Sequence, residues 1–283
     1  PLNPAYKAEE FEFYLSDLKA KALVAQRGVE TPARAVAEKL GVPVLELVPD
    51  AEGGGAGAFS LEGGAEGSAA RPGMAGTDDV ALVLHTSGTT ARPKIVPLTH
   101  GNVTASARSI ARTLELSPND ACLNVMPLFH IHGLIAATLA SLAGGGAVVC
   151  TPGFNALRFF GWLDMEKPTW YTAVPTMHQA ILARAERNRA VIERTPLRFL
   201  RSSSASLPAQ VMRDLEAAFN APVIESYGMT EASHQMASNP LPPRPRKPGI
   251  VGVAAGPEIA IMDEDGNLLP QGAIGEVVIR GPG

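Results

Sequence analysis

A loop of hydroxyl-bearing and small residues is the part of this sequence best suited to hold a phosphate. It reads His85-Thr86-Ser87-Gly88-Thr89-Thr90-Ala91-Arg92-Pro93-Lys94, after an apolar stretch and before a helical pattern. Backbone N–H groups and hydroxyls of such a loop can surround a polyphosphate, and a Lys adds a mobile positive charge. It is not a GxxxxGK[ST] loop, because Ile95 follows Lys94. Composition alone fits an exposed Ser/Thr turn equally well. The candidate phosphate-binding residues are Thr86, Ser87, Gly88, Thr89, Thr90 and Lys94.

Two histidines one residue apart follow a strand pattern, in the segment Pro127-Leu128-Phe129-His130-Ile131-His132-Gly133. If the strand continued, His130 and His132 would face the same side. A zinc pair is one interpretation, but no Asp, Glu or Cys stands at ligand spacing nearby. The sequence therefore favours a structural pair over a metal site.

A serine-rich segment, Leu200–Pro208, stands at the end of a predicted strand and before a predicted helix. N–H groups and hydroxyls at such a position contact a ligand readily, and Ser203, Ser204 and Ala205 are the candidates. Ser206 as a helix N-cap is the alternative.

An acidic segment, Glu225-Ser226-Tyr227-Gly228-Met229-Thr230-Glu231, also follows a strand. The ring of Tyr227 can lie against adenine, Thr230 can donate to a phosphate, and Glu231 can hold Mg²⁺. A surface carboxylate is the alternative for Glu231. The nucleotide-binding candidates in this segment are Ser226, Tyr227, Gly228, Met229 and Thr230.

Alternating strand and helix patterns must position these segments. They predict an α/β fold with a doubly wound, mostly parallel sheet and ligands at the carboxyl ends of its strands. The expected strands are 80–84, 121–125, 147–150, 169–174, 199–202 and 223–226, and the expected helices are 11–19, 32–40, 101–114, 134–143, 177–187 and 209–219.

The chain divides by composition into four parts. Residues 1–50 predict part of a first α/β subdomain, and residues 51–77, rich in Gly and Ala, predict a flexible connection. Residues 78–248 predict a second α/β subdomain that carries the site. A hairpin of Glu258–Met262 and Gly275–Arg280 predicts the start of a β subdomain in residues 249–283.

Composition excludes several function classes. The 24 basic and 28 acidic side chains give a net charge of −4 without a dense basic block, which argues against a nucleic-acid partner. Cys122 and Cys150 fit reduced thiols that fill the core of a cytoplasmic protein. The uncharged stretch from Gly133 to Phe154 is interrupted by glycines and predicts no membrane span. No GxSxG motif supports a serine hydrolase.

The order Thr-Ser-Gly-Thr-Thr-x-x-Pro-Lys, followed by Tyr-Gly-x-Thr-Glu, resembles the adenylate-forming superfamily of acyl-CoA synthetases, luciferases and peptide-synthetase adenylation domains. The resemblance implies the same nucleotide and Mg²⁺ roles as above, with Lys94, His130, Thr230 and Glu231 catalytic and His130 beside the reacting carboxylate. The chain departs from the family at Ala91 and Ile95, where Gly is common.

Within that superfamily the chain looks most like the oxalate-CoA ligase branch. The resemblance rests on Pro1-Leu2-Asn3-Pro4, on 170–176, on Ser204–Ser206, and on Thr230-Glu231-Ala232-Ser233-His234. A dicarboxylate needs donors or a cation for the carboxylate that does not react. The substrate-binding candidates are His130, His132, Ser204 and His234, with Arg201 as a further one.

The resemblance implies a reaction with ATP, a small carboxylate and coenzyme A that forms an acyl-AMP and then a thioester. The family also uses an Asp, a hinge and a late Lys that lie beyond Gly283, so this chain alone is expected to be nearly inactive. Fatty-acid or aromatic-acid ligases and a non-catalytic nucleotide-binding module stay open as alternatives. A peroxisomal location is an alternative to the cytoplasm, and no oligomeric state is predicted.

Overall fold

The computed structural model describes residues 1–50, 55, 57–64, 72–86 and 93–283. Residue contacts divide the chain into two units, Leu2–Met74 and Ala75–Gly283, the latter grouped with Pro1. Each unit has its own apolar core, and the candidate site residues all belong to the larger one.

The smaller unit is a short α/β layer. Its three strands pair in the order β1 (Leu23–Gln26), β2 (Val44–Pro49) and β3 (Phe59–Glu62), with β1 parallel to β2 and β3 antiparallel to it. Helices α1 (Ala8–Asp17) and α2 (Pro32–Lys39) pack through Phe11, Leu15 and Val36. Strand β3 lies in the stretch predicted to be a flexible connection, so that prediction is wrong for its four residues.

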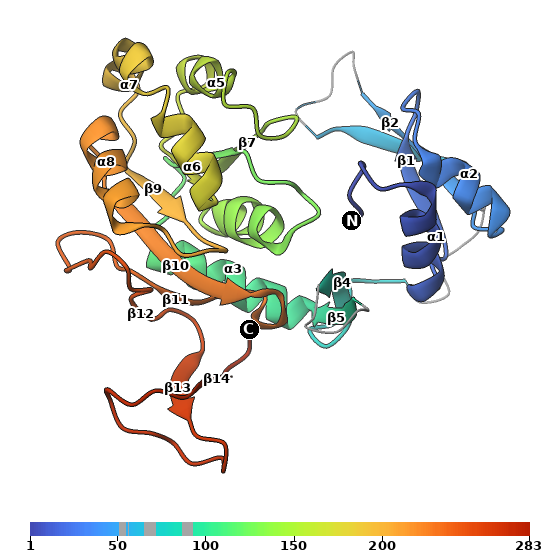
Figure 1. Cartoon of the computed structure of the whole chain (residues 1–283). Coiled ribbons are helices and arrows are strands. Elements are labelled where there is room, and N and C mark those ends of the chain that lie inside the picture. The colour runs from blue at the N-terminus through green and yellow to red at the C-terminus, as the bar shows by residue number, and fades with distance from the viewer. Residues whose placement is uncertain (51–54, 56, 65–71, 87–92) are drawn as a thin grey trace. The chain divides into compact units, whose positions relative to one another are not determined.

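The largest sheet of the larger unit has seven strands, in the order β12-β11-β10-β9-β8-β6-β7. Its strands β7, β9, β10, β11 and β12 are labelled in Figure 1. Strands β6 to β10 are mutually parallel, whereas antiparallel pairing joins β11 to β10 and β12 to β11 at one edge. The predicted doubly wound, mostly parallel sheet is therefore confirmed. The strand bounds are β6 Ala121–Asn124, β7 Ala147–Cys150, β8 Trp170–Ala173, β9 Phe199–Ser202, β10 Val223–Met229, β11 His234–Ser238 and β12 Val253–Ala254.

Successive side chains of each central strand pack into opposite apolar layers. On one face lie Cys122, Trp170, Phe199 and Ile224, covered by α3 and the helix that begins at His132. Their neighbours along the strands enter the layer beneath α5 to α8. Period-two alternation thus explains why these strands are buried on both faces. The bounds of the helices are α3 His100–Thr113, α4 Ala140–Ala143, α5 Phe159–Glu166, α6 Pro175–Leu182, α7 Arg189–Arg194 and α8 Ala209–Phe219.

The helix expected at 134–143 has an unusual backbone. Residues His132–Leu139 form a π-helix, which continues into α4. The helix expected at 177–187 ends earlier as α6, and a 3₁₀ turn at Glu186–Asn188 leads into α7. Helix α8 and strand β9 match their predicted bounds.

The strand expected at 80–84 does not join the large sheet. It is β4 (Val80–Thr86), and it pairs antiparallel with β5 (Lys94–Thr99) in a separate two-stranded sheet. Strand β5 was not predicted. The pairing sets Thr86 opposite Lys94 and so closes the base of the loop between them.

The C-terminal hairpin is confirmed. Strands β13 (Glu258–Met262) and β14 (Glu276–Arg280) pair antiparallel, and Gly266 has a φ of 85° in the connecting loop. This positive φ is a conformation that favours glycine.

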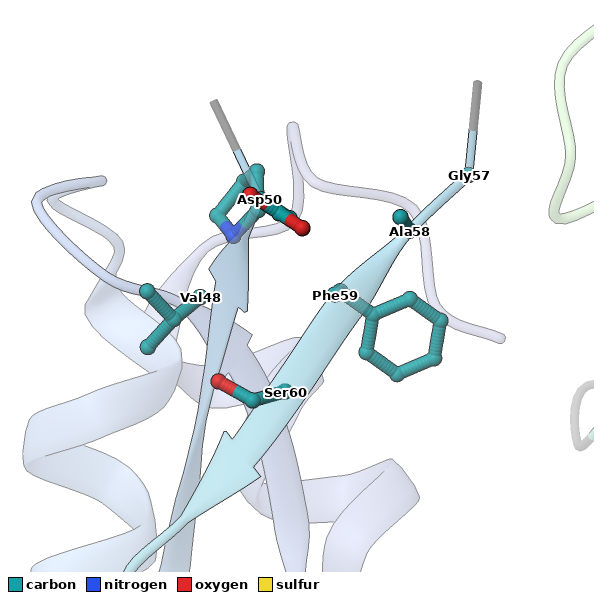
Figure 2. A pocket seen from close by; sticks show the side chains of 7 residues that line it. Val48, Asp50, Gly57, Ala58, Phe59 and Ser60 are labelled. Carbon is teal, nitrogen blue, oxygen red and sulfur yellow. The ribbon is translucent and has the colours of Figure 1, made fainter. Parts of the chain in front are cut away.

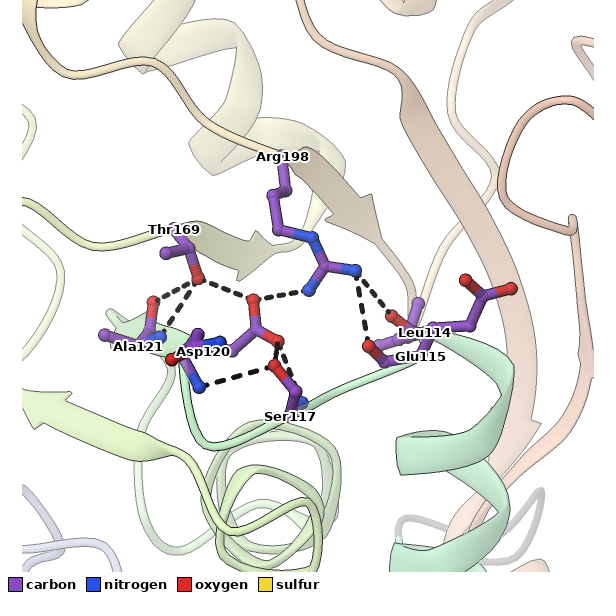
Figure 3. Close-up of polar contacts among 8 residues, drawn as sticks. Leu114, Glu115, Ser117, Asp120, Ala121, Thr169 and Arg198 are labelled. Atoms are coloured by element: carbon purple, nitrogen blue, oxygen red, sulfur yellow. Dashed lines mark hydrogen bonds and ion pairs between the residues drawn. The ribbon is translucent and has the colours of Figure 1, made fainter.

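Polar side chains tie the amino ends of the central strands together (Figure 3). Buried Asp120, before β6, forms an ion pair with Arg198, before β9, and accepts hydrogen bonds from Ser117 and Thr169. Burial alone would raise the pKa of Asp120, but these donors outweigh it and the pKa is lowered. We call these four residues the Asp120 staple.

Two predictions about composition are tested by the fold. In the described part of the chain, no helix is long and apolar enough to cross a bilayer. Cys122 is buried, as predicted for a core residue, but Cys150 is exposed at the end of edge strand β7, so its assignment to the core is wrong.

Candidate active site

A row of polar side chains crosses the sheet where its parallel strands end. Asn124, Thr172 and Arg201 lie in register on β6, β8 and β9, each two residues beyond an apolar residue of the layer under α3. The same alternation therefore directs these polar side chains to that face. Ligands of open α/β sheets bind at this edge, so the row marks the candidate site.

His132, the first residue of the π-helix, lies against this row with 1% of its surface exposed. Its Nδ1 is 3.0 Å from Ser204 Oγ, and its Nε2 is 2.6 Å from Thr172 Oγ1 and 3.3 Å from Arg201 Nη1. Because a guanidinium only donates, Nε2 must accept and Nδ1–H must donate to Ser204. This tautomer is neutral, in agreement with burial and the nearby charges holding the pKa of His132 well below its usual range.

Arg201 is a fully buried cation, and no ion pair joins it to a carboxylate of the described residues. Its Nη2 donates to Gln235 Oε1 at 3.3 Å, and its Nε has no partner in the ranges described. Burial lowers the pKa of Arg201 to about 9, so it remains charged at neutral pH. A buried charge is costly without a counter-charge, which makes this position suited to an anion.

His234 completes the buried cluster. Its ring meets that of His132 edge to face, with centroids 5.0 Å apart, and burial with the charge of Arg201 keeps its pKa well below the usual range. Its φ of 99° is rare for a residue with a side chain. A Cβ at Gly228 would lie 1.4 Å from the carbonyl oxygen of His234, so this strained approach requires glycine.

A cavity of about 330 Å³ adjoins the cluster and shares Ser204 with it. Its lining joins the serine-rich and acidic segments, which lie on β9 and β10 and just beyond them. Five predicted nucleotide-binding residues therefore share one cavity. The lining residues are Ser204, Ala205, Ser206, Glu225, Ser226, Tyr227, Gly228, Gly249 and Val251.

The base of the phosphate loop meets the acidic segment directly. Thr86 Oγ1 donates to Glu231 Oε1 at 3.3 Å, although 145 positions separate them in the chain. Lys94 lies opposite Thr86 across the hairpin and is exposed. Farther along, Ser106 of α3 donates to the carbonyl of Ser233 at 2.6 Å, which fixes the helix after the loop to the same segment.

The other predicted residues fall around this centre. Exposed His130 packs against Phe129 in a turn, outside the hydrogen bonds of the buried cluster, so the two histidines do not share a strand face. Ser203 is buried and donates to the carbonyl of Ser226 rather than lining the cavity. Met229 is half-exposed at the end of β10, and Thr230 opens a short 3₁₀ turn that contains Glu231. Ser87, Gly88, Thr89 and Thr90 lie outside the described residues.

Two alternative interpretations lose their support. Both ring nitrogens of His132 are within hydrogen-bond distance of protein groups, and no cluster of three or more metal-ligating side chains occurs among the residues the structure describes. Pro208, not Ser206, precedes the first turn of α8, and no side chain caps that helix.

Sequence reasoning missed Thr172, Gln235 and Glu225, and it ranked Arg201 below the histidines. A signal for Arg201 was present, because an arginine follows Phe199 and Leu200 inside an apolar strand. Gln235 gave no comparable signal, since β11 was not predicted.

A separate hollow of about 600 Å³ in the smaller unit is lined by the end of β2, the start of β3 and residues next to them (Figure 2). Asp50 is the one titratable side chain among its described lining residues, and none of the candidate site residues borders it. The chemistry of the chain is thus concentrated in the larger unit.

The structure is an α/β protein with a buried polar cluster and an adjoining cavity at the carboxyl ends of its parallel strands, and comparison with known proteins gives its family. Residues 1–283 match the family described as AMP-binding enzyme, so the chain belongs to that family. It is 47% identical to the oxalate–CoA ligase of Arabidopsis thaliana over 100% of its length and 55% of that protein.

Two further similarities are to a curated CoA ligase and to a solved structure. The sulfoacetate–CoA ligase of Cupriavidus necator is 34% identical, with 99% of the chain and 54% of that protein covered. The ATP-bound crystal structure of MatB from Rhodopseudomonas palustris matches with a TM-score of 0.79 and 31% identity, over 100% of the chain and 55% of that structure. The chain spans about half the length of the relatives it matches.

Proposed function

We propose that the complete protein containing this chain is an ATP-dependent carboxylate–CoA ligase for a small dianionic acid, with oxalate as the first candidate. The observation that carries the proposal is Arg201, a buried cation without a carboxylate partner among the described residues, beside a cavity lined by nucleotide-binding candidates. The similarity to oxalate– and sulfoacetate–CoA ligases supports it, since both named acids carry two negative charges at neutral pH.

In this proposal the two ends of the acid have different partners. The non-reacting carboxylate takes a charge-assisted hydrogen bond from Arg201, with His132 and His234 beside it. The reacting carboxylate points past Ser204 into the cavity, because Ser204 belongs to both the cluster and the cavity lining. Exposed His130 stays a proposed contact of that reacting end.

The nucleotide is proposed to lie between the β4–β5 hairpin and the acidic segment. Tyr227 lines the cavity and can stack on adenine, while Thr86, Lys94 and the loop between them hold the phosphates. The exposed carboxylate of Glu231, adjacent to the Thr86 hydroxyl, offers the hard oxygen ligands that Mg²⁺ prefers. Mg²⁺ bound there would neutralise charge on the triphosphate.

The proposed reaction has two displacements. A carboxylate oxygen attacks the α-phosphorus of ATP, a P–O bond to pyrophosphate breaks, and acyl-AMP forms. The thiol of coenzyme A, after losing its proton, then attacks the acyl carbon and releases AMP. The residues of this chain contribute by positioning and charge neutralisation, which is the main demand of such chemistry.

The buried cluster proposed to bind the acid argues against the alternative substrates. A long-chain fatty acid needs an apolar tunnel and an aromatic acid needs an apolar slot. His132, Thr172, Arg201, His234 and Gln235 instead present buried polar groups. An apolar substrate would leave Arg201 Nε and His234 Nδ1, which have no partner among the described residues, unpaired at a cost of about 1–3 kcal/mol each.

The direct test is ATP–pyrophosphate exchange by the complete protein with oxalate, malonate, hexanoate and benzoate. We expect oxalate to give the highest kcat/KM and the two monocarboxylates to give little exchange. Faster exchange with hexanoate or benzoate than with either dicarboxylate would contradict the proposal.

Arg201→Met separates function from structure at the decisive residue. We expect a loss of at least about 100-fold in kcat/KM for oxalate, because a buried charged contact is removed. The melting temperature should stay the same or rise, since an uncompensated buried charge is replaced by an apolar chain of similar length. A variant with a lower melting temperature and an unchanged kcat/KM for oxalate would show that Arg201 has a structural role instead.

A further inference from the structure

The π-helix that begins at His132 sets the direction in which the His132 side chain points. Its backbone uses i to i−5 hydrogen bonds, as in the bond from Ala140 N to Ile135 O. Such wide turns are rare and often lie at functional sites. An α-helix over the same residues would place the His132 ring at a different angle around the axis.

Contacts fix the two ends of this helix independently. Downstream, Ile135, Ala136 and Ala140 are buried in the apolar layer with α3. Upstream, Gly133 lies so close to the Pro127 carbonyl that a Cβ would be 2.4 Å from its oxygen, and the His132 ring lies within hydrogen-bond distance of Ser204 and Thr172. We call these downstream and upstream contacts the two anchors of the helix. Its wide π-helical turns allow both sets of contacts to form at once.

Asn124 bridges the anchors from the end of β6. Its Oδ1 accepts from Met126 N at 3.0 Å, which fixes the amide orientation because a backbone N–H only donates. Its Nδ2 then donates to Gly133 O at 3.4 Å and to Thr138 Oγ1 at 3.3 Å, and Thr138 Oγ1 donates to Gly133 O at 2.8 Å. Asn124 is 2% exposed. We call Asn124, Gly133 and Thr138 the Asn124 clamp.

We propose that Asn124 and Thr138 are positioning residues that hold the π-helical turn and thereby aim His132 at the acid substrate. The inference rests on the proposed function, since it concerns the same buried cluster. Neither side chain belongs to the cavity lining or hydrogen-bonds to Arg201, so each acts through the direction of the His132 ring. Loss of the clamp lets the turn relax and moves that ring away from Ser204 and Thr172.

The test compares Thr138→Val and Thr138→Ala, which lack the hydroxyl, with Thr138→Ser, which keeps it. In ATP–pyrophosphate exchange by the complete protein, both hydroxyl-free variants should raise the KM for oxalate by about 10-fold or more, because small misplacements at a reacting centre are costly. The KM for ATP should not change, and Thr138→Ser should behave like the wild type.

Ser141→Ala is the matched control. Ser141 lies on the same helix, is buried, and donates to the carbonyl of Ala137 at 2.6 Å, but it is outside the clamp. Its loss should lower the melting temperature about as much as Thr138→Val does, without a change in the KM for oxalate. A purely structural role for Thr138 would make the two variants alike in KM as well.

The outcomes separate this inference from the proposed function. An unchanged KM for oxalate in both hydroxyl-free variants of an active enzyme would overturn the positioning role and leave the ligase proposal intact. Absence of exchange by the wild-type protein with every acid would overturn the proposed function and this inference with it. If Thr138→Val does not fold, Thr138→Ala gives the same comparison.

Discussion

At the scale of single residues, the proposed binding of an acid depends on the charges of the buried cluster. Arg201 remains protonated at neutral pH, while burial keeps His132 and His234 neutral. The cluster therefore has one unbalanced positive charge and several hydrogen-bonding groups. A bound carboxylate would balance that charge, and it would raise the pKa of both histidines because a nearby anion favours their protonated forms.

Removing the charges at the base of the phosphate loop tests the nucleotide side of the site. We expect Lys94→Ala and Glu231→Gln each to lower the rate of ATP–pyrophosphate exchange by about 100-fold. Lys94 would neutralise triphosphate charge directly, and Glu231 would do so through the proposed Mg²⁺. Both side chains are exposed, so thermal unfolding should not change. Exposed Glu264, in the loop between β13 and β14, gives the control Glu264→Gln. Wild-type exchange in both site variants would refute the assignment.

At the scale of elements, the sequence predicted the central strands well because their apolar runs and the intervening helices have distinct periods. It missed β5, whose Pro97 is typical of a loop or edge strand, and β11, which is buried throughout and shows no alternation. It could not identify the π-helix, because its eight residues have nearly uniform apolar character around His132. The candidate site was predicted segment by segment, but its buried polar row depends on strand register, which local patterns do not contain.

The Asp120 staple gives a prediction about how these elements are held. Arg198→Ala leaves the buried Asp120 carboxylate without its cation, so we expect unfolding to become easier by about 2–3 kcal/mol. Arg198 also donates to the carbonyls of Leu114 and Glu115 at the end of α3, at 3.4 Å and 3.3 Å (Figure 3).

Urea denaturation measures the effect of Arg198→Ala. The control is Arg189→Ala, whose ion pairs with Glu186 and Glu193 are exposed and should contribute less than about 1 kcal/mol. Equal losses of unfolding free energy in the two variants would contradict a stabilising role of the Asp120 staple. The KM for oxalate should be unaffected, because the staple lies at the opposite ends of the strands from the site.

At the scale of the whole molecule, the larger unit separates its structural and chemical tasks along the strands. The Asp120 staple occupies the amino ends of β6, β8 and β9, and the polar row occupies their carboxyl ends. Parallel strands make this possible because equivalent ends meet at one edge. Substitutions at one end should therefore affect stability, and those at the other should affect catalysis.

Acid should destabilise the fold through its buried histidines. Burial lowers the pKa of His178 to about 4, from 6.5, and the pKa values of His132 and His234 are also lowered. The unfolded chain thus binds more protons below about pH 6.5, so stability falls as the pH falls, by up to about 1.4 kcal/mol per pH unit for each histidine.

Urea titrations of the complete protein from about pH 7 to about pH 5 would measure this slope. A constant or increasing free energy of unfolding over that range would contradict the assignment of neutral, buried histidines. Saturating oxalate should make the free energy of unfolding depend less on pH. The bound anion raises the pKa values of the nearby histidines in the folded state and so brings them closer to those of the unfolded chain.

A crystal structure of the complete protein with ATP and oxalate tests the central claim most directly. The account predicts that the triphosphate lies between the Thr86–Lys94 base of the hairpin and Glu231, with one oxalate carboxylate within about 3 Å of the Arg201 guanidinium. A nucleotide bound away from Glu231, or an oxalate that does not reach Arg201, would contradict it.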